Sequence, residues 1–319
     1  MSLGSRDLTI GVDLGGTKIT AGVVNPDGKV LSHLRVPTPH QPEAVGDAVA
    51  SAVDQVRQGW DDVHAVGIGA AGYVDERRST VRFAPNLGWH EKPLRDLVQR
   101  RCGLPTVVEN DANAAAWGEF RYGAAADHDD MVMVTVGTGL GGGIVIAGKL
   151  FRGRFGMGGE IGHYRAVPDG LPCGCGQHGC IEQYASGTAH TRRARAAAAA
   201  DLRAAAGILA LGDGTPDGIE GGHITQAARG GDRFALELFE RTGKWVGQVL
   251  ADLGSVLDPA VFVLGGGVGD TGELLRRSAE AAYRARLGGG KNRIFSEVLT
   301  ATVGPDAGLI GAAALARLS

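Results

Sequence analysis

Two segments of the chain place apolar residues on both sides of a glycine turn, and each predicts a β-hairpin. Residues 8–24 (LTIGVDLGGTKITAGVV) indicate a strand, a turn and a second strand, because β-branched and apolar residues flank a turn that few residues except glycine could make. Residues 131–148 (MVMVTVGTGLGGGIVIAG) repeat this layout. An offset of 122 positions places Asp13 on Thr135 and Gly15 on Gly137. The repeat predicts two related α/β domains that face each other across a ligand cleft.

Apolar residues at spacings of three and four predict four longer helices, at residues 42–59, 112–123, 189–211 and 233–257. Further strands are expected at residues 64–72, 105–110 and 260–267. This alternation favours mixed α/β layers. Small and acidic residues follow Gly123, so we expect a smaller lobe at 1–122 and a larger lobe at 123–305. The short apolar helix predicted at 306–319 could return to the first lobe.

Composition limits the kinds of partner that the chain is expected to bind and the compartment in which it is expected to function. The chain has 53 glycines, so glycine turns and close backbone approaches are expected to matter. Its formal net charge of -3 does not favour binding to nucleic acid or to an anionic membrane. The first residues show no signal pattern, and no apolar run of about 18 residues occurs, so a cytoplasmic location is expected. In a reducing compartment, clustered cysteines favour a metal site over disulfides.

The two glycine turns are candidate phosphate sites. GTGLGG at 137–142 matches the dinucleotide pattern, and Glu160 follows at a suitable distance, but a strand comes next instead of the required helix. The mononucleotide pattern GxxxxGK[ST] does not occur. Turn N–H groups can still hold phosphate oxygens without a helix, although each turn could also be an ordinary hairpin turn. Asp13, just before the first turn, could hold Mg²⁺ through water, and Lys18 could approach a phosphate or be merely solvated.

Asn110 and Asp111 lie where a predicted strand ends and a helix begins, in the stretch ENDAN. Both residue types are good helix caps. Ligand crevices of α/β sheets also open at the carboxyl ends of strands, where such side chains can bind a ligand and accept a proton. The two roles are compatible.

The stretch CGCGQHGC at 173–180 holds three of the four cysteines. Cys173, Cys175 and Cys180 with one histidine would form the Cys₃His set of a closed, tetrahedral structural zinc site. A closed site leaves no position for an activated water, so metal-assisted hydrolysis is not favoured. Spacing leaves two candidates for the fourth ligand, His163 and the nearer His178.

The segment EIGHYRAVPDGLPCGCGQHGCIE (160–182) resembles the signature of the ROK family of bacterial sugar kinases. The likeness extends in the family's order through DLGGTK at 13, ENDAN at 109, GTGLGGG at 137 and LGGGVG at 264. Within the family, RFAPNLGW and GHYRAVPDGLPCGCG are most similar to ATP-dependent glucokinases, especially those of actinobacteria. The resemblance implies the two-lobed, actin-like ATPase (ribonuclease H-like) fold, with the zinc loop 160–182 in the larger lobe.

The resemblance also implies roles for individual residues. Asp111 matches the catalytic base, and His163 matches both a sugar contact and the zinc ligand, which would fix its ring orientation. The remaining sugar contacts would be Asn86, Asn110, Glu160 and Glu182, with Asp111 also touching the sugar. The expected nucleotide contacts are Asp13, Gly15, Gly16, Thr17 and Lys18 in the first turn, Gly137, Thr138 and Gly139 in the second, and Gly265, Gly266 and Gly267 on the adenosine side.

The activity implied is phosphorylation of glucose at its 6-hydroxyl by ATP, with Mg²⁺ and a structural Zn²⁺. Another hexose, such as mannose, fructose or an N-acetylhexosamine, is the near alternative. A sugar-responsive repressor is disfavoured, because only 12 residues precede Asp13 and a DNA-binding module would need more. Strict polyphosphate-using relatives generally lack the cysteine loop, which favours ATP and leaves a second donor open. A homo-oligomer, a dimer or tetramer, is expected.

Overall fold

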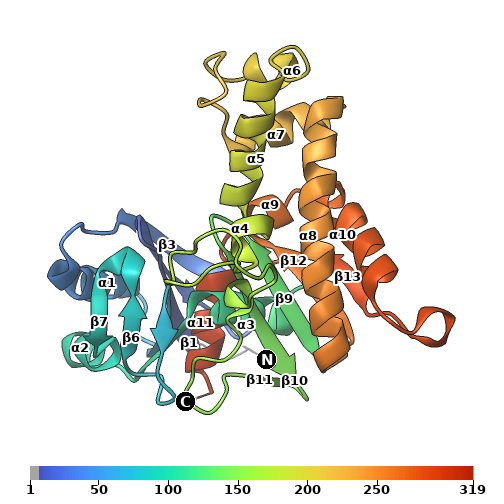
Figure 1. Ribbon diagram of the computed structural model, residues 1–319. Helices are drawn as coiled ribbons and strands as arrows, with labels where there is room; N and C mark the ends of the chain where they lie inside the picture. The colour runs from blue at the N-terminus through green and yellow to red at the C-terminus, as the bar shows by residue number, and fades with distance from the viewer. Residues whose placement is uncertain (1–6, 319) are drawn as a thin grey trace. The chain divides into compact units, whose positions relative to one another are not determined.

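The computed structural model describes residues 7–318, in which strands and helices alternate along the chain (Figure 1). The described residues divide into two compact units. One consists of the described part of Met1–Val132 together with Gly143–Gly159 and Thr302–Ser319, and the other of Met133–Gly142 and Glu160–Ala301. The first unit therefore contains a segment, 143–159, that the sequence-based boundary at 122/123 assigns to the larger lobe.

The first unit is built on a sheet in the order β3-β2-β1-β4-β8. β1 pairs with β2 antiparallel and with β4 parallel. A separate three-stranded sheet has the order β5-β6-β7. The elements are β1 (Leu8–Leu14), β2 (Lys18–Val24), β3 (Val30–Pro37), α1 (Pro42–Arg57), β4 (Val63–Ala70), β5 (Tyr73–Val74), β6 (Val81–Ala84), β7 (Trp89–Lys92), α2 (Leu94–Cys102), β8 (Thr106–Asn110), α3 (Asp111–Tyr122) and α11 (Ala307–Ala316).

Side chains of β1 alternate between the two faces of this sheet. Ile10, Val12 and Leu14 belong to the apolar cluster that also contains the buried residues of α1. The opposite face contacts α11, which approaches very closely: a Cβ at Gly11 would lie 1.9 Å from the carbonyl oxygen of Leu309. Only glycine allows the helix backbone to rest on the strand here. Asp13 shares this face with Gly11, so its carboxylate is directed toward α11.

A second sheet has the order β11-β10-β9-β12-β13. Its strands are β9 (Met131–Val136), β10 (Leu140–Ile146), β11 (Lys149–Leu150), β12 (Val261–Gly265) and β13 (Glu297–Thr300). The helices that follow Gly159 and precede α11 are α4 (Glu182–Ala185), α5 (Gly187–Ala200), α6 (Ala206–Leu209), α7 (Gly221–Arg229), α8 (Arg233–Leu257), α9 (Gly266–Gly269) and α10 (Glu273–Arg286). Short 3₁₀ turns occur at Pro85–Leu87, Ile161–His163 and Gly290–Asn292.

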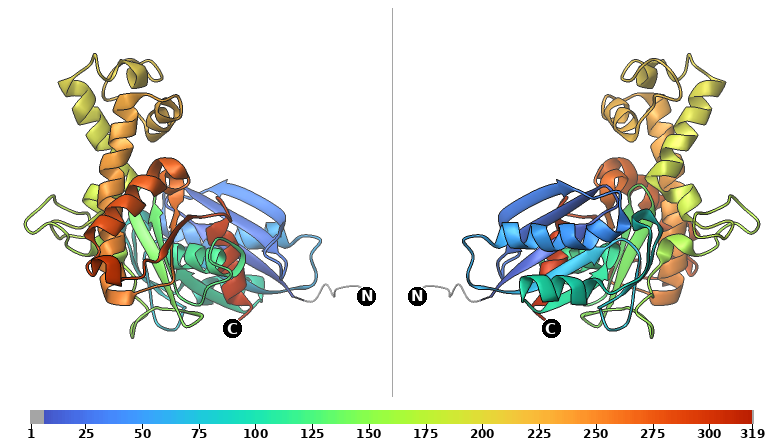
Figure 2. Two further views of the ribbon diagram at one scale, coloured as in Figure 1. Left: turned by 90° about the vertical axis from the view of Figure 1, so that its right-hand side faces the viewer. Right: turned by 90° about the vertical axis from the view of Figure 1, so that its left-hand side faces the viewer.

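Helices α5 and α8 pack together, and α6 and α7 lie near one end of this pair (Figure 2). The predicted helix over 233–257 is confirmed as α8, which begins after Asp232 caps its first turn by accepting a hydrogen bond from the backbone N–H of Ala235. The predicted helix over 189–211 is wrong in its length, because α5 ends at Ala200. Asp201 Oδ1 accepts from the N–H of Ala204 at 2.9 Å, so a local turn replaces the next helical hydrogen bonds.

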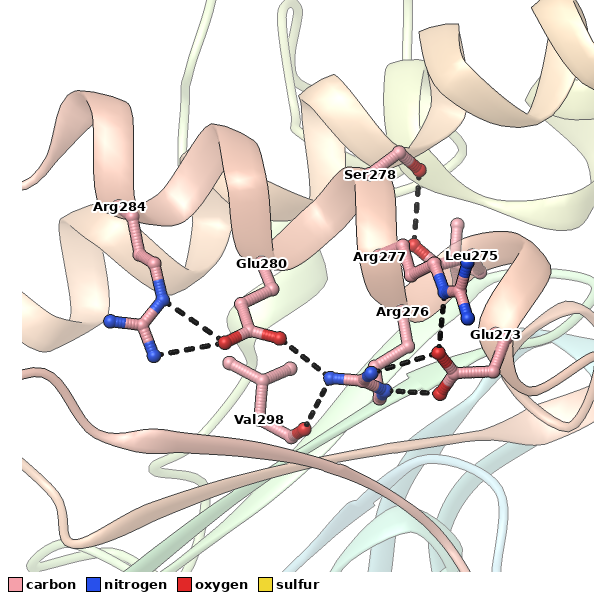
Figure 3. A network of polar contacts seen from close by, with 8 residues as sticks. All are labelled: Glu273, Leu275, Arg276, Arg277, Ser278, Glu280, Arg284 and Val298. Carbon is pink, nitrogen blue, oxygen red and sulfur yellow. Dashed lines mark hydrogen bonds and ion pairs between the residues drawn. The ribbon is translucent and has the colours of Figure 1, made fainter.

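Helix α10 carries a chain of ion pairs between its own residues (Figure 3). Arg276 bonds both Glu273 and Glu280, and its guanidinium also donates to the carbonyl of Val298 on β13 at 3.4 Å. Hydrogen bonds from Arg276 and Arg277 lower the pKa of Glu273 to about 2. Of these contacts, the bond from Arg276 to Val298 links the helix to the edge strand of the second sheet. None of the helices in the described range 7–318 is long and apolar enough to cross a membrane.

Candidate functional site

The turn between β1 and β2 gathers the first group of candidate residues. It closes with a hydrogen bond from the N–H of Gly15 to the carbonyl of Lys18, at 3.0 Å. Asp13 is half-buried at the end of β1, and burial raises its pKa from 3.8 to about 6. The negative charge of Asp111 contributes to this rise and the positive charge of Lys18 opposes it, so these three charges lie close enough to interact. A Cβ at Gly16 would lie 3.4 Å from the Cβ of Asn86, which places Asn86 beside the turn.

The β8–α3 corner holds Asn110 and Asp111. Asn110 caps α3, because its Oδ1 accepts from the N–H of Asn113 at 3.0 Å, and its Nδ2 donates to the carbonyl of Gly72 at 3.1 Å. Asp111 Oδ1 accepts from the N–H of Ala112 at 2.9 Å, and burial raises the pKa of its carboxyl group above 3.8. A carboxylate destabilised by burial has an increased tendency to take a proton. The capping role that the sequence left open is confirmed for Asn110, and the functional role of the pair stays a prediction.

The carboxylate of Glu109 supports this corner. Glu109 was not among the predicted site residues. Its side chain is 1% exposed. One carboxylate oxygen accepts from the N–H of Asn110 at 2.9 Å and from Asn113 Nδ2 at 3.2 Å. The other lies 3.0 Å from Arg78 Nε and 2.7 Å from Arg152 Nε. Every group around the carboxylate is a hydrogen-bond donor, so its charge holds the strand end, the helix start and two arginines together.

The second glycine turn borders a large cavity in the second unit. Gly137 N–H donates to the carbonyl of Gly139 at 3.1 Å. The cavity has a volume of about 1330 Å³, and the predicted residues that line it are Gly137, Thr138 and Gly267. Several lining residues come from α5, α7 and the segment before α7 and were not predicted, because nothing in the sequence separates them from a solvated helix face; they include Thr188, Thr191, Arg192, Arg195, Asp217 and Gln226.

The predicted adenosine-side turn at 265–267 joins β12 to α9. Gly266 has φ of 82°, and a Cβ there would lie 2.9 Å from the carbonyl carbon of Val136, so only glycine lets this turn lie against the end of β9. Gly265 is buried at the end of β12 and is absent from the residues that line the cavity. Of these three glycines, Gly267 is the one with a surface toward the cavity.

Four metal-binding side chains converge in the loop before α4. The ligand atoms of His163, Cys173, Cys175 and Cys180 all lie within 4.8 Å of one another. Cys175 Sγ lies 3.6 Å from Cys180 Sγ, and Cys173 Sγ lies 3.7 Å from His163 Nδ1. Tetrahedral Zn²⁺ with Zn–S distances of about 2.3 Å requires ligand separations of roughly 3.8 Å, so the donor set and its size fit zinc.

The fold explains why His163 and not His178 belongs to this group. His163 ends the 3₁₀ turn Ile161–His163 and turns Nδ1 toward Cys173, whereas His178 is exposed. The loop is closed by glycine: Gly179 has φ of 76°, and a Cβ there would lie 1.7 Å from the carbonyl oxygen of Val167. Nδ1 faces the sulfur atoms, which leaves the Nε2 of His163 for a different partner.

Glu182 lies between the cysteine loop and the second glycine turn. Its Oε1 is 3.2 Å from Cys173 Sγ, and its Oε2 accepts from the N–H of Leu140 at 3.4 Å. A Cβ at Gly139 would lie 2.9 Å from the same Oε2, so Glu182 packs directly against the second glycine turn. Glu160 is half-buried, and its carbonyl accepts from the N–H of His163 at 3.1 Å. Asn86, Asn110 and Asp111 belong to the first unit, and Glu160, His163 and Glu182 to the second.

Comparison with known proteins is decisive for the family. A sequence profile described as the ROK family matches residues 9–318. This chain belongs to the ROK family. The predicted family and the mixed α/β, actin-like ATPase fold class are therefore confirmed.

Several relatives of this ROK protein are named as glucokinases. It is 55% identical over 310 residues to a glucokinase of Streptomyces coelicolor, which covers 97% of this chain and 98% of the relative. It is 36% identical over 316 residues to a glucokinase of Thermotoga maritima, with coverage of 97% and 96%. It also resembles the crystal structure of a ROK family glucokinase from Streptomyces griseus in complex with glucose and AMPPNP, with 56% identity, a TM-score of 0.91 and coverage of 98% and 100%.

Proposed function

We propose that this ROK protein transfers the γ-phosphoryl group of ATP to the 6-hydroxyl of glucose. The observation that carries the proposal is the β8–α3 corner, where Asp111 is a half-buried carboxylate with a raised pKa at the first position of α3, directly after the strand. The glucokinase names of the relatives and the glucose and AMPPNP bound in the Streptomyces griseus structure support the same substrates.

The reaction needs one base and rigidly held groups that stabilise the negative charge of the phosphates. The 6-hydroxyl oxygen attacks the γ-phosphorus, its proton passes to a carboxylate oxygen of Asp111, and the bond from the γ-phosphorus to the bridging oxygen breaks to release ADP. The catalytic strength lies in positioning and in electrostatic stabilisation by backbone N–H groups of the two glycine turns. Asn110, whose amide is already fixed by Gly72 and Asn113, would present its remaining polar surface to a sugar hydroxyl.

The first unit has a carboxylate suited to Mg²⁺. Asp13 is half-buried, and burial together with the charge of Asp111 raises its pKa to about 6 although Lys18 opposes the rise. A hard cation held through water by Asp13 fits this environment. When bound, Mg²⁺ would neutralise charge on the phosphates of ATP.

The cysteine loop is assigned a structural zinc, bound by His163 Nδ1 and the three sulfur atoms of Cys173, Cys175 and Cys180. The metal would fix the imidazole so that Nε2–H can donate to a sugar hydroxyl. Glu160 and Glu182 would accept hydrogen bonds from neighbouring hydroxyls, with Asn86 adding a further sugar contact. A ligand cleft between lobes, a cytoplasmic location and a dimeric or tetrameric state stay predictions.

A coupled assay of ADP release would test the activity directly. Glucose, mannose, fructose and N-acetylhexosamines would each be measured with ATP and with polyphosphate as donors. We expect the highest kcat/KM for glucose with ATP. A higher value for another hexose would transfer the assignment to that sugar, and no turnover with any sugar would refute a kinase function.

A further inference from the structure

Each of the two glycine turns is supported by a threonine that lies outside it. In the first unit, Thr38 follows β3 and is 7% exposed. Its hydroxyl donates to the carbonyl of Gly15 at 2.8 Å, and its N–H donates to the carbonyl of Thr17 at 3.0 Å. Two carbonyl groups of the turn are therefore bonded to one residue.

The second unit has a related arrangement at the start of α5, in which two residues share the contacts. The hydroxyl of Thr188 donates to the carbonyl of Thr138 at 2.7 Å, and its N–H lies 3.4 Å from the same oxygen. The preceding Gly187 donates its N–H to the carbonyl of Gly137 at 2.7 Å. A Cβ at Gly187 would lie 2.6 Å from that oxygen, so this approach requires glycine.

These contacts determine which side of each turn presents its backbone N–H groups and can therefore attract an anion. A carbonyl oxygen directed at a phosphate would repel it, whereas backbone N–H groups attract it. Thr38 bonds the carbonyl oxygens of Gly15 and Thr17, and Thr188 bonds that of Thr138, so each threonine fixes the direction of the carbonyl groups that it bonds. At the second turn the carbonyls also meet the positive end of the α5 dipole, whose first N–H groups would otherwise lack partners.

We propose that Thr38 and Thr188 are positioning residues that hold the two glycine turns in their phosphate-binding form. The inference rests on the proposed function, because it takes ATP as the ligand of both turns. Neither threonine is assigned a contact with the reacting atoms. Each acts through the backbone of its turn, so removing its hydroxyl should weaken phosphate binding and leave the binding of adenosine and glucose intact.

The test compares Thr38→Val and Thr188→Val with Thr38→Ser and Thr188→Ser in the full-length protein. Valine keeps the shape and removes the hydroxyl, and serine keeps the hydroxyl. Thr215→Val is the matched control, because the Thr215 hydroxyl bonds Asp213 at a similar 2.8 Å in an exposed loop. Calorimetry would measure the affinities for AMPPNP with Mg²⁺, for adenosine and for glucose, and steady-state assays would measure kcat and the KM for ATP.

Each valine variant should bind AMPPNP about 3- to 12-fold more weakly, the range expected for one lost hydrogen bond, and its KM for ATP should rise in parallel. Its adenosine and glucose affinities should change less than about twofold. The serine variants and Thr215→Val should behave as the wild type. An equal loss of AMPPNP and adenosine affinity would indicate general damage and overturn the proposal, as would valine variants with unchanged AMPPNP affinity.

The same measurements separate this proposal from the proposed function. Wild-type protein that binds AMPPNP no more tightly than adenosine would refute the role of the turns in ATP binding altogether. Wild-type protein that prefers AMPPNP, with valine variants that keep this preference, would leave the kinase assignment intact and overturn the positioning role alone.

Discussion

Replacing Glu109 by glutamine should destabilise the protein and impair the proposed base at the same time. The substitution keeps the shape of the side chain and removes its charge. The neighbours of the carboxylate are the Nε atoms of Arg78 and Arg152, the N–H of Asn110 and the Nδ2 of Asn113, all of them donors. Whichever way the new amide is turned, its NH₂ group faces a donor, and no charge remains to balance the two arginines.

The magnitude follows from burial. Removing one partner of a buried ion pair costs about 3–5 kcal/mol. Arg78 and Arg152 keep side-chain exposures of 25% and 12%, so water offsets part of that cost. We therefore expect Glu109→Gln to lower the free energy of unfolding by about 3 kcal/mol. Because Asn110 and Asn113 lose a charged acceptor at the corner that carries Asp111, kcat/KM for glucose should fall by about 10- to 100-fold.

Urea unfolding at pH 7 would measure the first effect, and steady-state kinetics the second. Glu237→Gln is a matched control, because Glu237 also meets an arginine Nε at 3.0 Å, yet its partner Arg233 has 93% of its side chain exposed. An exposed pair of this kind contributes about 0.5 kcal/mol or less. In a cycle with Arg78→Met, the double variant should lose less than the sum of the single variants. A Glu109→Gln variant as stable as Glu237→Gln would refute the reasoning.

Three further predictions concern the base, the metal and a buried histidine. Asp111→Asn should keep the fold and glucose affinity while kcat falls by about 10²–10⁴-fold, and wild-type activity should fall as pH drops through the raised pKa of this base; near-normal kcat in the variant would remove Asp111 from this role. Metal analysis should find one zinc per chain, and chelation should lower both the melting temperature and the glucose affinity, whereas metal-free protein with unchanged affinity would contradict this link. Burial lowers the pKa of His190 from 6.5 to about 4, so wild-type stability should be lost as pH falls through this interval, by about 3 kcal/mol in all. His190→Asn should not show this loss in unfolding measured from pH 7 to pH 4, and equal pH slopes for the two proteins would contradict the assignment.

The elements that the sequence predicted best are those determined by local rules. Helix α8 has an apolar stripe and an aspartate cap, so its limits at Arg233 and Leu257 agree with the pattern. Helix α5 shows the opposite case, since a run of alanines favours continuation but the side chain of Asp201 offers the backbone an alternative partner. The pattern of hydrophobic positions contains no information on that local competition.

The candidate site also contains some residues that the sequence could predict and others that it could not. Residues in short motifs, such as Asp111 and the cysteines of 173–180, could be found because glycine, acid and thiol spacing has a direct chemical meaning. Glu109 stands in the same motif as Asp111, yet its role depends on Arg78 and Arg152, which only the fold brings to it. Residues of the α5 face of the cavity, such as Arg192, likewise carry no pattern that separates them from solvated side chains.

Thr38 and Thr188 also show what the internal duplication of the sequence does not predict. The offset of 122 positions that places Gly15 on Gly137 would carry Thr38 to residue 160, which is a glutamate, and not to Thr188. Thr38 follows a strand and Thr188 lies at the start of a helix, and they bond carbonyl groups at different positions of the two turns, those of Gly15 and Thr17 in one and that of Thr138 in the other. Inheritance from one duplicated unit would have kept the support at equivalent positions. A shared physical requirement, to direct turn carbonyls away from a bound phosphate, explains why two unrelated segments carry the same residue type in the same role.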